Sequence, residues 1–131
     1  MENQQTETPG AGLAIAAEAL YLTNLLLLPG IAFLALGWLW LRHRDAPPLA
    51  AGHLEQSFSA SLVGGVLLVL ASAVIVMAGG FESAITWTVV IIYFTCCHST
   101  LILFGIVGLA RAMAGRPYRY PLIGRLSGGI G

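Results

Sequence analysis

The six basic residues of this chain are all arginines, and they follow two of its apolar stretches. Arg42 and Arg44 follow the first stretch, and the last stretch is followed by Arg111, Arg116, Arg119 and Arg125. The polar N-terminus and the short segment after residue 80 carry only acids among their charged residues. Because arginine-rich segments that flank apolar spans stay in the cytoplasm, this asymmetry predicts an oriented membrane protein with a cytoplasmic C-terminus.

The composition excludes an ordinary soluble domain. Of 131 residues, 57% are hydrophobic and only 9% are charged, whereas a soluble domain carries about 25% charged residues. Nucleic acid is excluded as a partner, because no basic face lies outside the arginine clusters that flank the apolar stretches. The expected partners are the lipid bilayer and other integral membrane subunits.

The length of the apolar stretches predicts an all-α membrane protein with three transmembrane helices. Residues 1–10 are expected to be a disordered polar tail, without the positive segment of a signal peptide, so the first apolar segment should stay in the mature protein. A single domain, 11–126, then holds spans at about 19–41, 57–78 and 84–111.

Four further expectations complete the predicted topology. Proline removes a backbone hydrogen bond, so the first span should be kinked at Pro29-Gly30. Three crossings place the N-terminus outside and the C-terminus in the cytoplasm of a bacterium, across its inner membrane. Residues 112–131 should form a cytoplasmic tail on the headgroup surface. The expected interfacial anchors are Trp38, Trp40, Arg111, Tyr118, Arg119 and Tyr120.

Small residues recur at helical spacing on the second and third spans. Such faces let another helix approach closely within a membrane. They are either the contacts between the protein's own three helices or a docking surface for a partner subunit. The residues are Ser57, Ser61 and Gly65 on the second span, and Gly105, Gly108 and Ala112 on the third.

His98 is an ionisable residue near the middle of the third span, next to Cys96 and Cys97. A histidine at this depth marks either a functional site or a neutral imidazole bonded to a hydroxyl or a backbone carbonyl. Soft ligands and imidazole suit copper, zinc or haem iron. Three consecutive residues fan out over about 200° of a helix, so a metal would need ligands from a second helix. No cofactor is therefore predicted, with haem or copper at His98 as the alternative.

No catalytic set can be identified in the sequence. It contains no zinc-binding HExxH, no phosphate-binding glycine loop and no recognisable Ser/His/Asp arrangement. The apolar spans offer few polar side chains for a transport path, namely Asn24, Thr95, His98, Ser99 and Thr100. We therefore do not expect an enzyme.

The C-terminal segment AMAGRPYRYPLIGRL carries a family resemblance. Its Ala112, Gly115 and Tyr118, followed by Arg-Tyr-Pro-Leu, resemble the terminal motif of the bacterial DUF4870 family, which is grouped with Tic20-like small membrane proteins. The resemblance covers roughly residues 25–126 and implies a small helical inner-membrane protein. The motif itself would serve either as a membrane anchor or as a docking surface.

Together these observations predict a non-catalytic accessory or structural subunit that packs against a larger membrane complex. Two alternatives remain: a small translocation or transport component of the Tic20-like type, and a haem- or copper-binding membrane subunit that uses His98.

Overall fold

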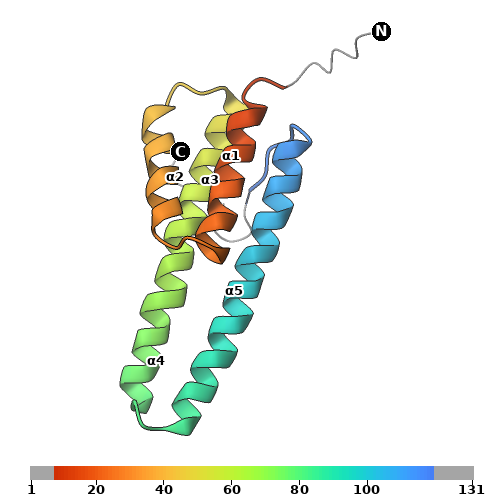
Figure 1. The fold of residues 1–131 in the computed structure, drawn as a ribbon. Helices are drawn as coiled ribbons and strands as arrows, with labels where there is room; N and C mark the ends of the chain where they lie inside the picture. The colour runs from red at the N-terminus through yellow and green to blue at the C-terminus, as the bar shows by residue number, and fades with distance from the viewer. Residues whose placement is uncertain (1–7, 120–131) are drawn as a thin grey trace.

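The computed structural model describes residues 8–119, and all regular structure in that range is helical (Figure 1). One helix of 32 residues runs from Pro48 to Gly79, and a second helix of 30 residues follows it; both are long and apolar enough to cross a membrane. The elements in chain order are α1 (Ala11–Leu26), α2 (Ile31–Arg42), α3 (Pro48–Gly65), a π-helical segment η1 (Val66–Leu70), α4 (Ala71–Gly79) and α5 (Ala84–Met113).

The elements α3, η1 and α4 pair with α5 in a long antiparallel hairpin (Figure 1). The turn follows Gly80, whose φ of 89° is a conformation that glycine tolerates best. Ser83 then caps α5, because its side chain accepts a hydrogen bond from the Thr86 amide at 3.4 Å. The two later predicted spans, 57–78 and 84–111, lie within these helices. The first of them begins earlier than predicted, since Pro48 occupies an initial helical position that suits proline.

The predicted kinked span at 19–41 is not what the structure contains. The chain reverses at residues 27–30, and α1 and α2 pack side by side against one half of the long hairpin (Figure 1). Proline disfavours helix at the residue before it, and Gly30 takes a φ of 86°. The Gly30 amide also donates to the Asn24 side-chain oxygen at 2.9 Å, which closes the turn. These local effects convert the expected kink into a reversal.

The reversal places three chain segments at one end of the molecule. A Cβ atom built on Gly10 would lie 2.8 Å from the Cβ of Ala50, and one built on Gly115 would lie 2.5 Å from the Thr8 hydroxyl. The start of α1, the start of α3 and the end of α5 therefore meet, and the turn after α4 lies at the opposite end (Figure 1). The predicted separation of the N-terminus from the arginine-bearing ends is not seen: residue 8 lies at the arginine end.

The core occupies the half of the hairpin that α1 and α2 cover. One cluster joins Tyr21 of α1 to Leu68 and Leu101, and a second joins Ala17, Leu36 and Leu54. Within the described chain, α4 buries no residue. The half that holds α4 is thus a pair of helices with largely exposed apolar side chains.

Candidate functional site

A buried polar cluster ties α1, α3 and the segment after α5 together at the arginine end. The imidazole Nδ1 of His53 lies 2.7 Å from Glu18 Oε1, and its Nε2 lies 2.9 Å from the carbonyl oxygen of Arg116. Both side chains have 0% exposure. Carbonyl and carboxylate oxygens accept, so both ring nitrogens must donate if Glu18 is ionised, which makes the pair an imidazolium and a carboxylate. A protonated Glu18 that donates to Nδ1 gives the same zero net charge.

Two neighbours shape this cluster. Gly108 of α5 lets the carboxylate approach, since a Cβ there would lie 2.6 Å from Glu18 Oε2. Tyr118, predicted as an interfacial anchor, is partly buried and packs against the core residues Tyr21 and Leu101. Burial, and secondly the negative charge of Glu18, raises the pKa of Tyr118, so this phenol stays neutral.

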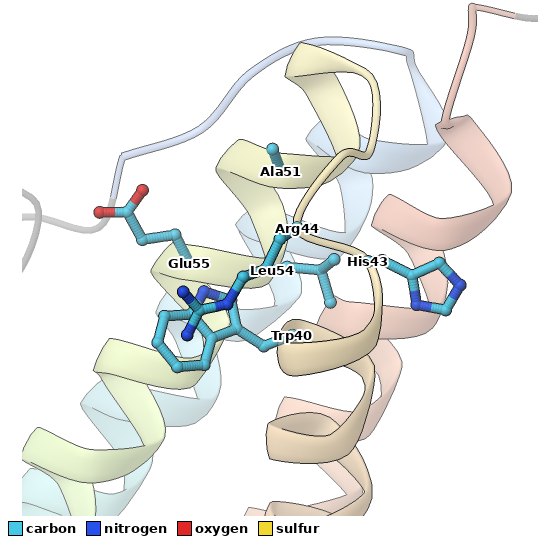
Figure 2. Close-up of a pocket in the computed structure, with 6 residues that line it drawn as sticks. All are labelled: Trp40, His43, Arg44, Ala51, Leu54 and Glu55. Atoms are coloured by element: carbon cyan, nitrogen blue, oxygen red, sulfur yellow. The ribbon is translucent and has the colours of Figure 1, made fainter.

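A small pocket of ≈ 260 Å³ opens between the end of α2 and the start of α3 (Figure 2). The Arg44 guanidinium lies over the Trp40 ring, 5.1 Å from its centroid, and Glu55 extends from α3 nearby. Arg42 lies similarly over Trp38, at 5.6 Å. A tryptophan beneath a guanidinium is typical of a membrane interface, where the ring contacts lipid and the cation reaches the phosphates. The geometry of Trp38 and Trp40 therefore suits their predicted role as interfacial anchors, which stays a prediction.

Halfway along the molecule, two side chains form hydrogen bonds with backbone carbonyl oxygens at helix irregularities. His98 Nε2 lies 2.8 Å from the carbonyl oxygen of Leu25 at the end of α1. The Tyr93 hydroxyl donates to the carbonyl oxygen of Leu67, at 2.7 Å, within the π-helical segment. Since a π-helical turn shifts the backbone pairing, its carbonyls need such outside donors. His98 thus forms a hydrogen bond with a backbone carbonyl, as one of the two interpretations of this residue predicts.

Nothing in the described part of the chain gathers metal ligands around His98. Residues 8–119 contain no group of three or more His, Cys, Asp or Glu side chains that could hold a metal. Cys96 and Cys97 are free thiols, and Cys96 is exposed. The Phe94 ring, 5.5 Å from the imidazole between centroids, is the aromatic neighbour on the same helix.

An apolar groove of ≈ 920 Å³ lies at the same depth, beneath the turn between α1 and α2. Its walls come from that turn and Phe33 of α2, from α3, η1 and the start of α4, and from Phe94 and His98 of α5. Ser61 is among the residues that line it, and its buried side-chain oxygen has no hydrogen-bond partner among the described residues.

The predicted small-residue faces have different surroundings. The face on α5 packs against α1: a Cβ on Gly105 would lie 2.6 Å from both Tyr21 and Leu22, and Ala112 is fully buried. On α3, Ser57 and Ser61 are buried, but Gly65 is exposed and no described atom lies within 4 Å of its Cβ position. Of the remaining predicted anchors, Arg111 and Arg119 are exposed, and Tyr120 lies outside the described residues.

Sequence reasoning missed the cluster of Glu18 and His53. The predicted topology places Glu18 outside and His53 in the cytoplasm, because a single crossing by residues 19–41 would separate them by the membrane. A carboxylate within an apolar stretch was the available signal, since a buried charge needs a partner. Asn24, a polar side chain within the predicted first span, accepts a hydrogen bond from the Gly30 amide and closes its own turn.

Replacing His98 with leucine should lower the free energy of unfolding by about 1 kcal/mol, because one polar contact within a membrane contributes about that much. Unfolding by SDS titration in mixed micelles measures the change. Ser99→Ala, on the same helix and exposed, is the matched control and should stay within about 0.5 kcal/mol of the original chain. A loss above about 3 kcal/mol would instead require a further role for the imidazole.

Comparison with known proteins now identifies the family. No curated protein and no solved structure matches the chain. The model of the MamF/MmsF family matches residues 11–127. The resemblance to DUF4870 and Tic20-like proteins is therefore wrong: it rested on one terminal motif and on hydropathy that many small membrane proteins share. The chain belongs to the magnetosome magnetite crystal formation protein family.

Proposed function

We propose that this protein is a non-catalytic integral subunit of the magnetosome membrane that supports magnetite crystal formation by packing against other membrane proteins. The family match supports the process. The subunit role is supported by the long apolar hairpin, because α1 and α2 cover only half of it. A helix pair with one uncovered half has surface available for other membrane helices.

The tryptophans indicate where the bilayer lies. Trp40 lines a pocket with Leu54, and Trp87 donates to the Phe81 carbonyl oxygen beside the turn after Gly79. Leu54 and Gly79 are 25 positions apart on one continuous helix, which corresponds to about 38 Å. A bilayer including its interfacial regions is about 40–45 Å thick. The long hairpin therefore crosses the membrane twice, with tryptophans at both interfaces.

The α1–α2 unit then enters only one leaflet. Its turn lines the groove together with Gly65, which is 11 positions after Leu54 and about 16 Å deeper. The first apolar stretch is thus a re-entrant hairpin in place of a crossing. Arginines at the shared end put that end, with residue 8, in the cytoplasm. The turn that carries Glu82 faces the magnetosome interior.

Cysteine labelling of intact membranes tests this arrangement. With Cys96 and Cys97 changed to alanine, single cysteines are placed at Thr8, Asp45 and Glu82. A membrane-impermeant maleimide should label positions 8 and 45 from one side and position 82 from the other. Labelling of positions 8 and 82 from the same side would restore three crossings and refute the re-entrant hairpin.

The proposed process is tested in a magnetite-forming host that lacks this gene. Crystal size, measured by electron microscopy, should change on deletion and return when the original chain is supplied. Crystals of unchanged size, number and shape would contradict the proposal.

A further inference from the structure

The pocket between the end of α2 and the start of α3 holds two opposite charges that do not pair with each other (Figure 2). Arg44, whose guanidinium lies over the Trp40 ring, and Glu55 of α3 both line it. Within residues 8–119 neither of these charged side chains forms an ion pair, and both are exposed. A ligand that carries one positive and one negative charge therefore complements this pocket better than a simple anion does.

The pocket lies at the cytoplasmic interface of the proposed membrane arrangement. Trp40 and Leu54, which mark that interface, are both among its lining residues. A ligand bound there is at the level of the lipid headgroups. A guanidinium binds phosphate oxygens through charge-assisted hydrogen bonds, and a primary ammonium donates hydrogen bonds to a carboxylate.

Three stacked aromatic rings, which we call the aromatic seam, lead from this pocket to the apolar groove. The Trp40 ring stacks on Phe58 with the two centroids 4.8 Å apart, and Phe58 stacks on Phe33 at 5.3 Å. Phe33 in turn belongs to the wall of the groove. All three side chains are half-buried, so part of each ring remains available to an apolar chain.

The pocket and the groove share one side of α3 and are separated by the depth of one lipid leaflet. Residues that follow one another at helical spacing lie on one face of a helix, and here they are Glu55, Phe58, Leu62 and Val66. Glu55 and Val66 are 11 positions apart, which corresponds to about 16 Å. One leaflet contributes half of a hydrocarbon core that is about 30 Å thick. The distance therefore suits one acyl chain.

We propose that the pocket and the aromatic seam bind one phospholipid of the cytoplasmic leaflet that carries a primary amine in its headgroup. Arg44 binds the phosphate and Glu55 binds the ammonium. One acyl chain lies along the aromatic seam and ends in the groove. The lipid site goes beyond the subunit role and rests on the proposed position of the bilayer.

Other headgroups lack one of these two contacts. A trimethylated ammonium has no N–H to donate to Glu55. A glycerol headgroup carries no positive charge, so it leaves the carboxylate beside a phosphate with only Arg44 to compensate. An ethanolamine headgroup supplies both the phosphate and the hydrogen-bonding cation.

Native mass spectrometry of the full chain tests the headgroup preference. The detergent-purified protein is mixed with equal amounts of dioleoyl phospholipids that carry ethanolamine, choline or glycerol. One copy of the ethanolamine lipid should be retained per chain, about tenfold more than either of the others, because only it makes both charged contacts. Equal retention of the three lipids, or a preference for choline or glycerol, would overturn the proposal.

Two variants separate the contributions of the two charges. Arg44→Gln should lower retention of the ethanolamine lipid about tenfold, because the phosphate loses its cation. Glu55→Gln should abolish the preference for ethanolamine over choline. Both side chains are exposed, so each variant should fold with unchanged circular dichroism. An unchanged preference in either variant would refute the assigned role of that residue.

Arg42→Gln is the matched control for the arginine. Arg42 lies over Trp38, 5.6 Å from the ring centroid, but does not line the pocket. Its replacement should leave lipid retention unchanged. A loss as large as that in Arg44→Gln would show that any arginine at this end attracts the lipid, and the pocket would then not be the site.

Photocrosslinking tests the path of the acyl chain. An ethanolamine phospholipid with a diazirine at the end of one acyl chain is incorporated with the protein into vesicles, and adducts are mapped by peptide mass spectrometry. Adducts at position 33 and at 58–69 should exceed those at Leu103 and Ile106, which are exposed on α5, at least tenfold. An even distribution would overturn this path. If position 82 is labelled from the interior but no lipid preference appears, the lipid site fails while the proposed membrane arrangement stands.

Discussion

Replacing His53 with leucine is expected to lower the free energy of unfolding by about 3–5 kcal/mol, since breaking a buried ion pair removes the imidazole that lies against the Glu18 carboxylate. His53 and Glu18 both have 0% exposure, so the pair is buried away from solvent. The Arg116 carbonyl loses its donor in the same change. SDS titration in mixed micelles, followed by circular dichroism, measures the loss.

The double variant Glu18→Leu/His53→Leu is the decisive control for this pair. Removal of both charges should destabilise the protein less than removal of His53 alone, because no buried charge remains. Glu55→Gln, an exposed acid two positions along the same helix, should change the free energy of unfolding by less than about 0.5 kcal/mol. Equal losses in the single and double variants would show that His53 contributes only packing.

The hydropathy of the chain was sufficient to predict the long hairpin. Both later spans are uncharged over more than a full crossing, and a helix of that length and composition has few alternatives in a membrane. The short segment 79–83 between the two predicted spans leaves room only for a turn. The end of α5 also followed from local rules, with Gly115 at a φ of 68° just beyond it.

The first apolar stretch could not be assigned from hydropathy, because a crossing and a re-entrant hairpin have the same composition. What distinguishes them is local and tertiary. Asn24 accepts from the Gly30 amide and so stabilises the reversal, and Glu18 finds His53 only when α1 runs beside α3. These two contacts form with a turn at Pro29-Gly30 and not with a kink, and sequence spacing does not reveal them.

Sequence spacing also could not tell which small-residue face packs against the protein's own helices. Spacing identified Gly105 and Gly108 as positions of close helix approach, and the structure brings α1 against both. Spacing could not tell them from Gly65, where no described part of the chain approaches. Which glycine faces the protein's own helix depends on the reversal of α1, so the sites could not be resolved before the topology.

Changing Gly108 to alanine is expected to lower the free energy of unfolding by about 1–3 kcal/mol, the usual range for overpacking a tight contact. The new Cβ would lie 2.6 Å from Glu18 Oε2 and 2.8 Å from its Cδ, so the carboxylate must shift. Such a shift weakens the contact to His53, which is 2.7 Å long in the original chain. The effect should therefore be larger in the original chain than in the Glu18→Leu/His53→Leu background, where no ion pair remains to be disturbed.

Gly12→Ala is the matched control, since no described atom lies within 4 Å of its Cβ position on α1. Alanine is a better helix former than glycine, so this change should leave stability equal or raise it by up to about 1 kcal/mol. If Gly108→Ala behaves like Gly12→Ala, α1 does not press against α5 at this point. The close approach at Gly108 and Gly105 is what holds α1 beside α5. Without it, packing would no longer explain why the first apolar stretch reverses.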